Sequence, residues 1–332
     1  VQGAMQEQRT AAALEGGGML SSFKRFAEIA REGSAALIGT SLKACEGVDA
    51  ILGGFSGVMV GASVAEKLEL PFIRAYNVPL TPTKTFPGAL FPRAPLPRRW
   101  SHRLTQEVLW QTSRAAANAA RIEALGLPPA PRLGGFDTPL LRQAPLLYGL
   151  SPAAMPRPDD WDPAIEVTGF WFLPESTGWT PPDDLVAFLD AGAPPLYLGF
   201  GSMSQEHPEA TRALVLEALS RVGRRAVVVS GWGGWSEERT DEVFVASSLP
   251  HSWLFPRMSA VVHHGGAGTT AAGLRAGVPS LVVPFHGDQP FSRPILDVHP
   301  GAEPIATQVH AAALQRLAVF VEDDHSQLIG QP

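Results

Sequence analysis

The second half of the chain alternates short apolar runs with segments of helical length, and this alternation limits the possible folds more than any other feature. The apolar runs are four or five residues long and lie at Leu196–Phe200, Ala226–Ser230, Val243–Ala246, Ala260–His263 and Ser280–Val283. Amphipathic helices are predicted at Asp183–Ala191, Pro208–Val222 and Thr269–Ala276. Short apolar strands separated by helices are typical of a parallel sheet buried on both faces. We therefore predict a doubly wound α/β domain, in which ligands bind beyond the carboxyl ends of the strands.

The first half follows the same pattern less regularly. A strand at Asp49–Gly54, a helix at Val58–Leu68 and a strand at Pro71–Tyr76 form a strand–helix–strand unit, the building block of a parallel sheet. The other expected elements are a helix from Leu20 to about Lys43, a long proline-rich loop from Val78 to Pro97, a helix from about Trp100 to Leu125, and strands at Leu146–Leu150 and Ile165–Phe170. Long loops are usually functional or mobile. A boundary within the proline-rich stretch Pro152–Pro182 gives predicted domains of residues 1–165 and 166–332.

Composition excludes several classes of protein. The 332 residues carry a net charge of −6, which argues against a nucleic-acid-binding protein because such proteins need a basic face. The single cysteine, Cys45, cannot form an internal disulfide and fits a cytoplasmic location. No apolar run reaches the ~18 residues that a membrane-spanning helix needs.

The segment Val261–Thr270 is the strongest candidate for a ligand site. It has the pattern of an apolar strand, a glycine-rich turn with two histidines, and a helix start with Thr269 as its cap. One imidazole and the first N–H groups of the helix could share an anion. The alternative is a tight turn whose glycines only permit close packing of helix and sheet. His263 and His264 are adjacent on a strand and point to opposite faces, so we do not predict a metal site with His286 and Asp288.

Two further segments have a functional and a structural interpretation. Gly201 and Ser202 follow a predicted strand and either contact a phosphate or form a turn. Asp288 and Gln289 offer oxygen and amide groups suited to sugar hydroxyls, although Asp288 would also serve as a helix N-cap. The common dinucleotide and P-loop motifs are absent. Gly54-Phe55-Ser56-Gly57 lacks the last glycine of a nucleophile elbow because Val58 occupies that position, which argues against a standard hydrolase.

Three segments together resemble the donor-binding signature of GT-B glycosyltransferases. They are Pro250–Arg257, His263–Thr270 and Pro284–Phe291, and they are most similar to sterol 3-beta-glucosyltransferase-like and antibiotic (glycopeptide, macrolide) glycosyltransferases. The resemblance implies two Rossmann-like domains facing across a cleft. It also implies transfer of a hexose, typically glucose, with inversion and without an essential metal or other cofactor. The donor would be a UDP- or dTDP-linked sugar, and the acceptor a hydroxyl of a sterol, polyphenol or macrolide-like molecule.

The resemblance also implies roles for individual residues. His264, with the backbone of Gly268 and Thr269, would bind the donor diphosphate, and Asp288 with Gln289 would hold sugar hydroxyls. The full set of implied donor-binding residues is Gly201, Ser202, Ser248, His251, His264, Gly266, Gly268, Thr269, Asp288 and Gln289. Ala272 stands where plant relatives have a ribose-binding glutamate, so the choice of nucleotide stays open.

The acceptor side is less well defined. Relatives begin with a strand and a glycine-rich loop that supply the catalytic base, and such a unit needs about 30 residues, too many to fit into Val1–Gly18. We therefore expect an incomplete N-terminal domain without an assigned catalytic residue. His102 or Asp137 could substitute as the base, or both are ordinary surface residues. Acceptor-pocket candidates, each of which could instead belong to the core or to loop packing, are Phe55, Tyr76, Asn77, Phe86, Phe91 and Trp110.

Two other functions remain open at this point. One is a catalytically impaired nucleotide-sugar-binding or auxiliary protein, which the expected lack of a base favours. The other is a sugar-nucleotide epimerase, which would require acid and base carboxylates that the sequence does not identify. Expected partners are the nucleotide sugar and a lipophilic acceptor but no nucleic acid, with peripheral membrane contact and a monomeric or homodimeric state as further expectations.

Overall fold

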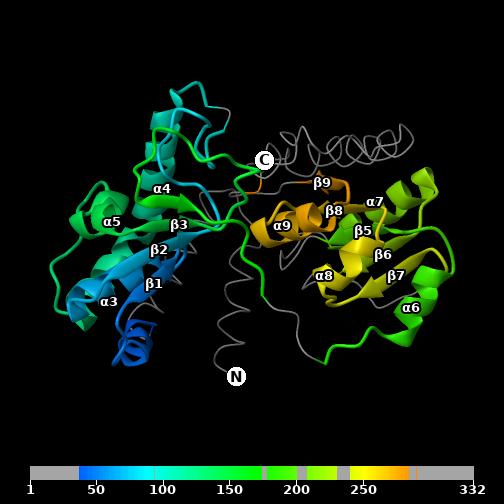
Figure 1. Ribbon diagram of the computed structural model, residues 1–332, viewed down its shortest axis with the longest axis horizontal. Helices are drawn as coiled ribbons and strands as arrows, with labels where there is room; N and C mark the ends of the chain where they lie inside the picture. Colours follow the sequence, from blue (N-terminus) through cyan, green and yellow to red (C-terminus); the bar gives the residue numbers. More distant parts are fainter. Residues whose placement is uncertain are drawn as a thin grey trace. The chain divides into compact units, whose positions relative to one another are not determined.

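The computed structural model describes residues 37–92, 94–173, 178–199, 208–229, 240–283 and 289. The chain divides into two compact units, Val1–Trp171 and Phe172–Pro332, and each contains a parallel β-sheet with helices (Figure 1). Most of the helix expected from Leu20 lies outside the described residues, and residues 37–44 are helical. Among the described helices, none combines the length and apolar character needed to cross a membrane.

The first unit has a four-stranded parallel sheet in the order β1-β2-β3-β4. The strands are β1 (Ile51–Gly54), β2 (Phe72–Tyr76), β3 (Leu146–Tyr148) and β4 (Ile165–Val167). Helix α3 (Val58–Leu68) connects β1 to β2, which confirms the predicted strand–helix–strand unit. The connection from the long helix to β3 contains the short helices η2 (Gly135–Asp137) and α5 (Pro139–Gln143), which the sequence did not predict.

The long helix of the first unit differs from the prediction at its end. The structure has α4 at Arg98–Ala119, followed by a turn of π-helix, η1, at Ala120–Ala124. Arg121 lies in this turn, and its guanidinium makes two bonds to Glu66 of α3, of 2.8 and 3.0 Å, while its carbonyl accepts the Leu127 N–H. These contacts attach the end of the helix to α3 and to the following loop.

The proline-rich loop at residues 78–97 is pinned to the body of the first unit. Tyr148 Oη accepts the N–H groups of Leu80 and Thr81, each at 3.0 Å. Asp160 accepts the Thr83 hydroxyl at 2.6 Å and the Lys84 N–H at 3.0 Å. The Thr83 hydrogen bond, together with Arg99, holds the pKa of Asp160 at about 2, so this carboxylate is ionised. The described part of the loop is therefore a fixed surface.

The second unit has a five-stranded parallel sheet in the order β7-β6-β5-β8-β9. The strands are β5 (Leu196–Gly199), β6 (Ala226–Val229), β7 (Val243–Ala246), β8 (Ala260–His263) and β9 (Ser280–Val282). The helices are α6 (Asp183–Asp190), α7 (Pro208–Val222), α8 (His251–Leu254), the short 3-10 helix η3 (Phe255–Arg257) and α9 (Ala267–Ala276). All five predicted strands are present, and the prediction of a doubly wound sheet is confirmed.

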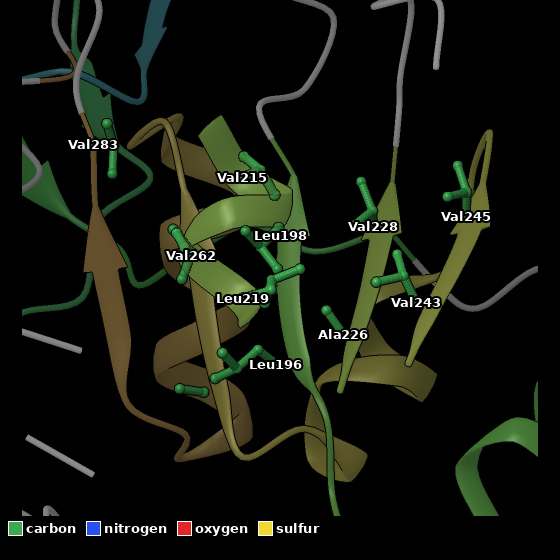
Figure 2. Close-up of a cluster of buried hydrophobic side chains, with 12 residues drawn as sticks. Leu196, Leu198, Val215, Leu219, Ala226, Val228, Val243, Val245, Val262 and Val283 are labelled. Carbon is green, nitrogen blue, oxygen red and sulfur yellow. The ribbon is translucent and has the colours of Figure 1, made fainter. Parts of the chain in front are cut away.

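Alternate residues of these strands build two separate cores, as expected for a sheet covered on both faces. On one face, Leu196 and Leu198 pack with Val262 beneath α7, as Figure 2 shows. On the other face, Tyr197 and Val261 pack with residues of α6, α8 and η3. This second face also receives the side chain of His263, two residues beyond Val261, which places a polar group at the end of an apolar layer.

Candidate functional site

The strand order of the second unit indicates where its ligand binds. The chain runs from β5 outward to β6 and β7 on one side and continues through β8 and β9 on the other, so the order reverses between β5 and β8. Open α/β sheets bind ligands at such a switch point, beyond the carboxyl ends of the strands. The last residues of these two strands, Gly199 and His263, are register partners. Gly201 and Ser202, which follow β5, lie outside the described residues, as does Asp288.

The turn that follows β8 requires glycine at its second position, residue 265. Gly265 has a φ of 92°, a conformation that side chains rarely adopt. A Cβ atom there would lie 2.8 Å from Val282 Cγ1 and 3.0 Å from the backbone oxygen of Gln289. The same contacts place Gln289, which is 5% exposed, directly against the turn.

Helix α9 begins two residues earlier than the sequence predicts. Its N-cap is Gly266 and its first residue is Ala267, so Thr269 is the third helical residue and not the cap. Gly266 has no side chain, and no side-chain cap bonds to this helix end within the described residues. The backbone N–H groups of the first turn have no partner within the helix by geometry and carry its positive dipole end. They can therefore donate to a bound anion.

The imidazole of His264 lies over this helix start. Its Nε2 atom is 2.5 Å from the position that a Cβ atom of Gly266 would occupy. An imidazole nitrogen and the N–H groups of a helix start thus lie side by side. This arrangement suits the diphosphate of a nucleotide, because both groups can bond to phosphate oxygens.

His263 is a structural residue of the site, whereas the sequence indicated only that one of the two adjacent histidines can face a ligand. Its Nδ1 accepts the N–H of Gly265 at 3.1 Å, so a neutral ring must carry its proton on Nε2. The side chain is fully buried, and Nε2 has no partner among the described residues. Burial lowers the pKa of His263 to about 3, with smaller contributions from His264 and His251. The neutral ring therefore holds the turn that carries His264. The sequence contained one indication of this role, because His263 is two residues after the apolar Val261 and therefore points to the same face of the strand.

His251 connects this turn to α8. Its Nε2 lies 3.2 Å from Tyr197 Oη, and its ring stacks on Phe255 with centroids 4.4 Å apart. Burial lowers the pKa of His251, and the nearby His264 lowers it further. The Tyr197 hydroxyl reaches this position by running past Gly199, where any Cβ atom would overlap with it. Ser248 is exposed on the connection from β7 to α8.

The structure thus brings together one part of the predicted donor-binding set. His264 lies over Gly266, Gln289 packs against Gly265 in the same turn, and Gly268 and Thr269 belong to the first turn of α9. His251 lies against Tyr197, and the nearby His264 lowers its pKa. No group of three or more His, Cys, Asp or Glu side chains suited to a metal ion occurs in the described part of the chain.

Three of the predicted acceptor residues, Phe55, Tyr76 and Asn77, lie at the carboxyl ends of β1 and β2. Phe55 is half-buried and meets Tyr76 edge to face, with ring centroids 6.0 Å apart. It also stacks on Phe136 at 6.5 Å. Tyr76 is buried, which raises the pKa of its hydroxyl, and the next residue, Asn77, is exposed. Phe86 and Phe91 are half-buried in the proline-rich loop.

Two predictions for the first unit are corrected. Trp110 is fully buried, and its indole N–H donates to the Pro131 carbonyl at 3.1 Å, so it is a core residue and not part of an acceptor pocket. His102 is not a surface residue, because its buried ring bonds through Nε2 to the Phe86 carbonyl at 3.0 Å. Burial lowers the pKa of His102. Asp137 is exposed and pairs with Arg142 at 3.2 Å, as an ordinary surface residue would.

Comparison with known proteins supports a glycosyltransferase relationship. Residues 213–328 match the family described as Erythromycin biosynthesis protein CIII-like, C-terminal domain. The chain is 42% identical over 231 residues to the sterol 3-beta-glucosyltransferase UGT80A2 of Arabidopsis thaliana, which covers 69% of this chain and 36% of the relative. The sterol 3-beta-glucosyltransferase of Cryptococcus neoformans var. neoformans is 35% identical over 284 residues, covering 77% of this chain and 18% of that protein. The chain therefore spans little more than a third of the length of the first relative and less of the second.

Solved structures agree on the fold. The glycotransferase of kitacinnamycin gives a TM-score of 0.57 at 18% identity, covering 90% of this chain and 78% of that one. The glycosyltransferase SnogD from Streptomyces nogalater gives 0.55 at 20% identity, covering 97% and 81%. The predicted GT-B fold class and the predicted resemblance to sterol and antibiotic glycosyltransferases are confirmed. Over the aligned region the chain is similar to sterol 3-beta-glucosyltransferases, and residues 213–328 match the EryCIII-like C-terminal domain.

Proposed function

We propose that this chain is an inverting hexosyltransferase, or the part of one that binds the donor, moving glucose from a UDP- or dTDP-sugar to the hydroxyl of a lipophilic acceptor. The observation that carries the proposal is the His264 ring over the uncapped start of α9, beside the switch between β5 and β8. The sterol and antibiotic glycosyltransferase relatives support the reaction class. They do not favour the alternative of an auxiliary protein without transfer activity.

The proposed chemistry separates into two halves. When the sugar–phosphate bond breaks, negative charge develops on the leaving nucleoside diphosphate. His264 and the first-turn N–H groups of α9 would stabilise that charge, because both lie at the same helix start and can bond to phosphate oxygens. Gln289, packed against Gly265, would support the sugar side of the donor together with Asp288. The acceptor hydroxyl must also lose a proton, and we assign no residue of this chain to that step.

The cellular setting is also a proposal. We infer a cytoplasmic enzyme, since Cys45 as the single cysteine leaves no internal disulfide to protect. It would act as a monomer or homodimer, without a metal ion, and would meet its lipophilic acceptor by peripheral contact with a membrane. The donor-binding roles of Gly201, Ser202 and Ser248 belong to the same proposal.

Binding and turnover, measured separately, test this function. Calorimetry with UDP-glucose and dTDP-glucose reports the donor site, and a panel of sterols and polyphenols reports transfer. We expect binding of at least one donor and transfer to at least one sterol. Donor binding without transfer to any acceptor would instead support the auxiliary alternative. Absence of binding to every nucleoside diphosphate would refute the donor site.

The position of the His264 ring predicts the effect of a small change at Gly266. Gly266→Ala adds a methyl group 2.5 Å from Nε2 and forces the ring to move. We expect donor binding to weaken by about 1 kcal/mol, roughly fivefold, because a hydrogen bond to phosphate is lost or distorted. Titration calorimetry of the single variants and the His264→Ala, Gly266→Ala double variant measures the coupling. In the His264→Ala background, Gly266→Ala should change the free energy of donor binding very little, because the imidazole ring is absent. Equal costs in both backgrounds would show that the methyl group acts on the donor directly.

A further inference from the structure

The first unit has a basic stretch that the donor site does not use. Between Glu69 and Glu107 the sequence contains no acidic residue. The same stretch contains six basic residues, in a chain whose net charge is −6. They are Arg74, Lys84, Arg93, Arg98, Arg99 and Arg103. A strong local excess of positive charge in an acidic protein indicates a surface for an anionic partner.

The same stretch exposes large apolar side chains. Trp100 is 59% exposed, Leu96 43% and Leu104 39%. Trp100 and Leu104 are four residues apart on α4 and share one face of the helix, while Ser101 and His102 point into the unit and are buried. We call this set, with the exposed basic residues Lys84, Arg98 and Arg103, the Trp100 surface.

Hydrogen bonds and a ring contact fix two of the cations of the Trp100 surface, Arg98 and Arg103. Arg98 donates to the carbonyls of Lys84 and Thr85 at 3.1 and 2.8 Å, bonds that fix its position and leave its charge in place. Arg103 lies 5.3 Å from the centroid of the Trp100 ring. Arg99 is different, because Asp160 neutralises it in a 2.8 Å ion pair. Three exposed cations, Lys84, Arg98 and Arg103, therefore belong to the same stretch as the exposed apolar side chains, and no ion pair to a carboxylate is found for them in the described part of the chain.

We propose that the Trp100 surface binds the interface of an anionic lipid bilayer. Tryptophan is enriched at the level of lipid headgroups, where its ring is partly buried and partly hydrated. Arginine side chains pair with anionic headgroups while their stems cover apolar surface. Exposed leucines would gain little from the phosphates of a nucleic acid, whereas a bilayer interface accepts them. The inference rests on the proposed function in one respect, since a lipophilic acceptor would be collected from the same membrane.

Sedimentation of the full chain with lipid vesicles tests the surface without any donor or acceptor. We expect binding to phosphatidylcholine vesicles that contain about one third phosphatidylserine, and weak binding to phosphatidylcholine alone. Raising the salt from about 0.05 M to about 0.5 M should release much of the bound protein, because screening shortens the range of the attraction. Trp100→Ala should lower the partition coefficient roughly tenfold. Arg103→Gln should lower it roughly fivefold, as expected for one charge near such a surface.

Two matched variants control for general loss of apolar or basic surface. Ile122→Ala removes an apolar side chain that is 52% exposed on η1, beyond the other end of α4, and Arg132→Gln removes an exposed cation from another loop. Both should bind vesicles like the unaltered chain. Equal binding to neutral vesicles, equal losses in the controls, or binding of an acidic peptide or DNA in place of vesicles would overturn the proposal.

A parallel transfer assay separates this inference from the proposed function. With the sterol delivered in cyclodextrin, Trp100→Ala should transfer sugar as the unaltered chain does. With the sterol in anionic vesicles, the same variant should be slower. Vesicle binding without sugar transfer in either format would refute the proposed function and still support the membrane-binding surface. Sugar transfer without vesicle binding would support the proposed function and refute the membrane-binding surface.

Discussion

Replacing His264 with alanine is expected to weaken nucleoside diphosphate binding by roughly 1.5–3 kcal/mol, the value of a charge-assisted hydrogen bond. That is a loss of about tenfold to somewhat over a hundredfold in affinity. The physical reason is the position of the ring, which lies over the first turn of α9 and would share the phosphate with it. Titration calorimetry with UDP and dTDP measures the change directly.

The control for this variant is Arg275→Gln. Arg275 lies in the last turn of the same helix and stacks on Phe172 at 4.6 Å, so it carries positive charge on α9 away from the proposed site. Its removal should leave diphosphate binding unchanged, which separates a contact from a general effect of charge. If His264→Ala bound diphosphate as tightly as the unaltered chain, the ring would be a turn residue only.

The second unit is expected to lose stability in acid because of His263. Its folded-state pKa is about 3, well below the ordinary value of 6.5. Between these two values the unfolded chain binds a proton that the folded chain does not. The free energy of unfolding therefore falls as the pH falls from about 6.5 toward 3, by up to about 1.4 kcal/mol per pH unit. Above pH 6.5 this contribution is fully present. His251, whose pKa is also lowered, acts in the same direction.

Hydrogen exchange of peptides from β8 measures this dependence within the second unit alone. His263→Leu should be less stable at neutral pH, because the Gly265 N–H loses its acceptor. The free energy of unfolding of this variant should fall less steeply between about pH 6 and about pH 4.5 than that of the unaltered chain. His102→Asn, in the other unit, should leave the slope for β8 unchanged. An unaltered slope in His263→Leu would mean that this ring accepts a proton in the folded state.

Prediction from the sequence succeeded where the signal is local. Helix α3 and the strands β7 and β8 lie at the predicted residues, because short apolar runs and the helical repeat report directly on burial. The start of α9 was wrong by two residues, since a helix can begin at a glycine that offers no capping side chain and Gly266 does so. Local pattern also did not show that α4 gives way to a π-helix, or that Arg121 in this turn bonds to Glu66, 55 residues away in the chain.

The candidate site shows the same division. The histidine-glycine turn and the helix after it could be identified from residue types and spacing. The opposite roles of two adjacent histidines could not, because they depend on which face of β8 packs against α8 and α9. His102 was misjudged for the same reason, since its partner is the carbonyl of Phe86 in a loop 16 residues earlier. Burial of single polar side chains is a property of the assembled unit.

The path of the Tyr197 hydroxyl past Gly199 has a consequence for engineering this chain. A larger residue at 199 would require a shorter one at 197, and the shorter residue would leave His251 without its partner. Tyr197 and Gly199 lie on the same strand and His251 is 54 residues away from Tyr197, yet the three positions must change as a set. Exchanging the glycine loop after β5 between relatives should therefore succeed when β5 and the start of α8 are transplanted together with it. The segment from β5 to the start of α8 should therefore be exchanged between relatives as one unit.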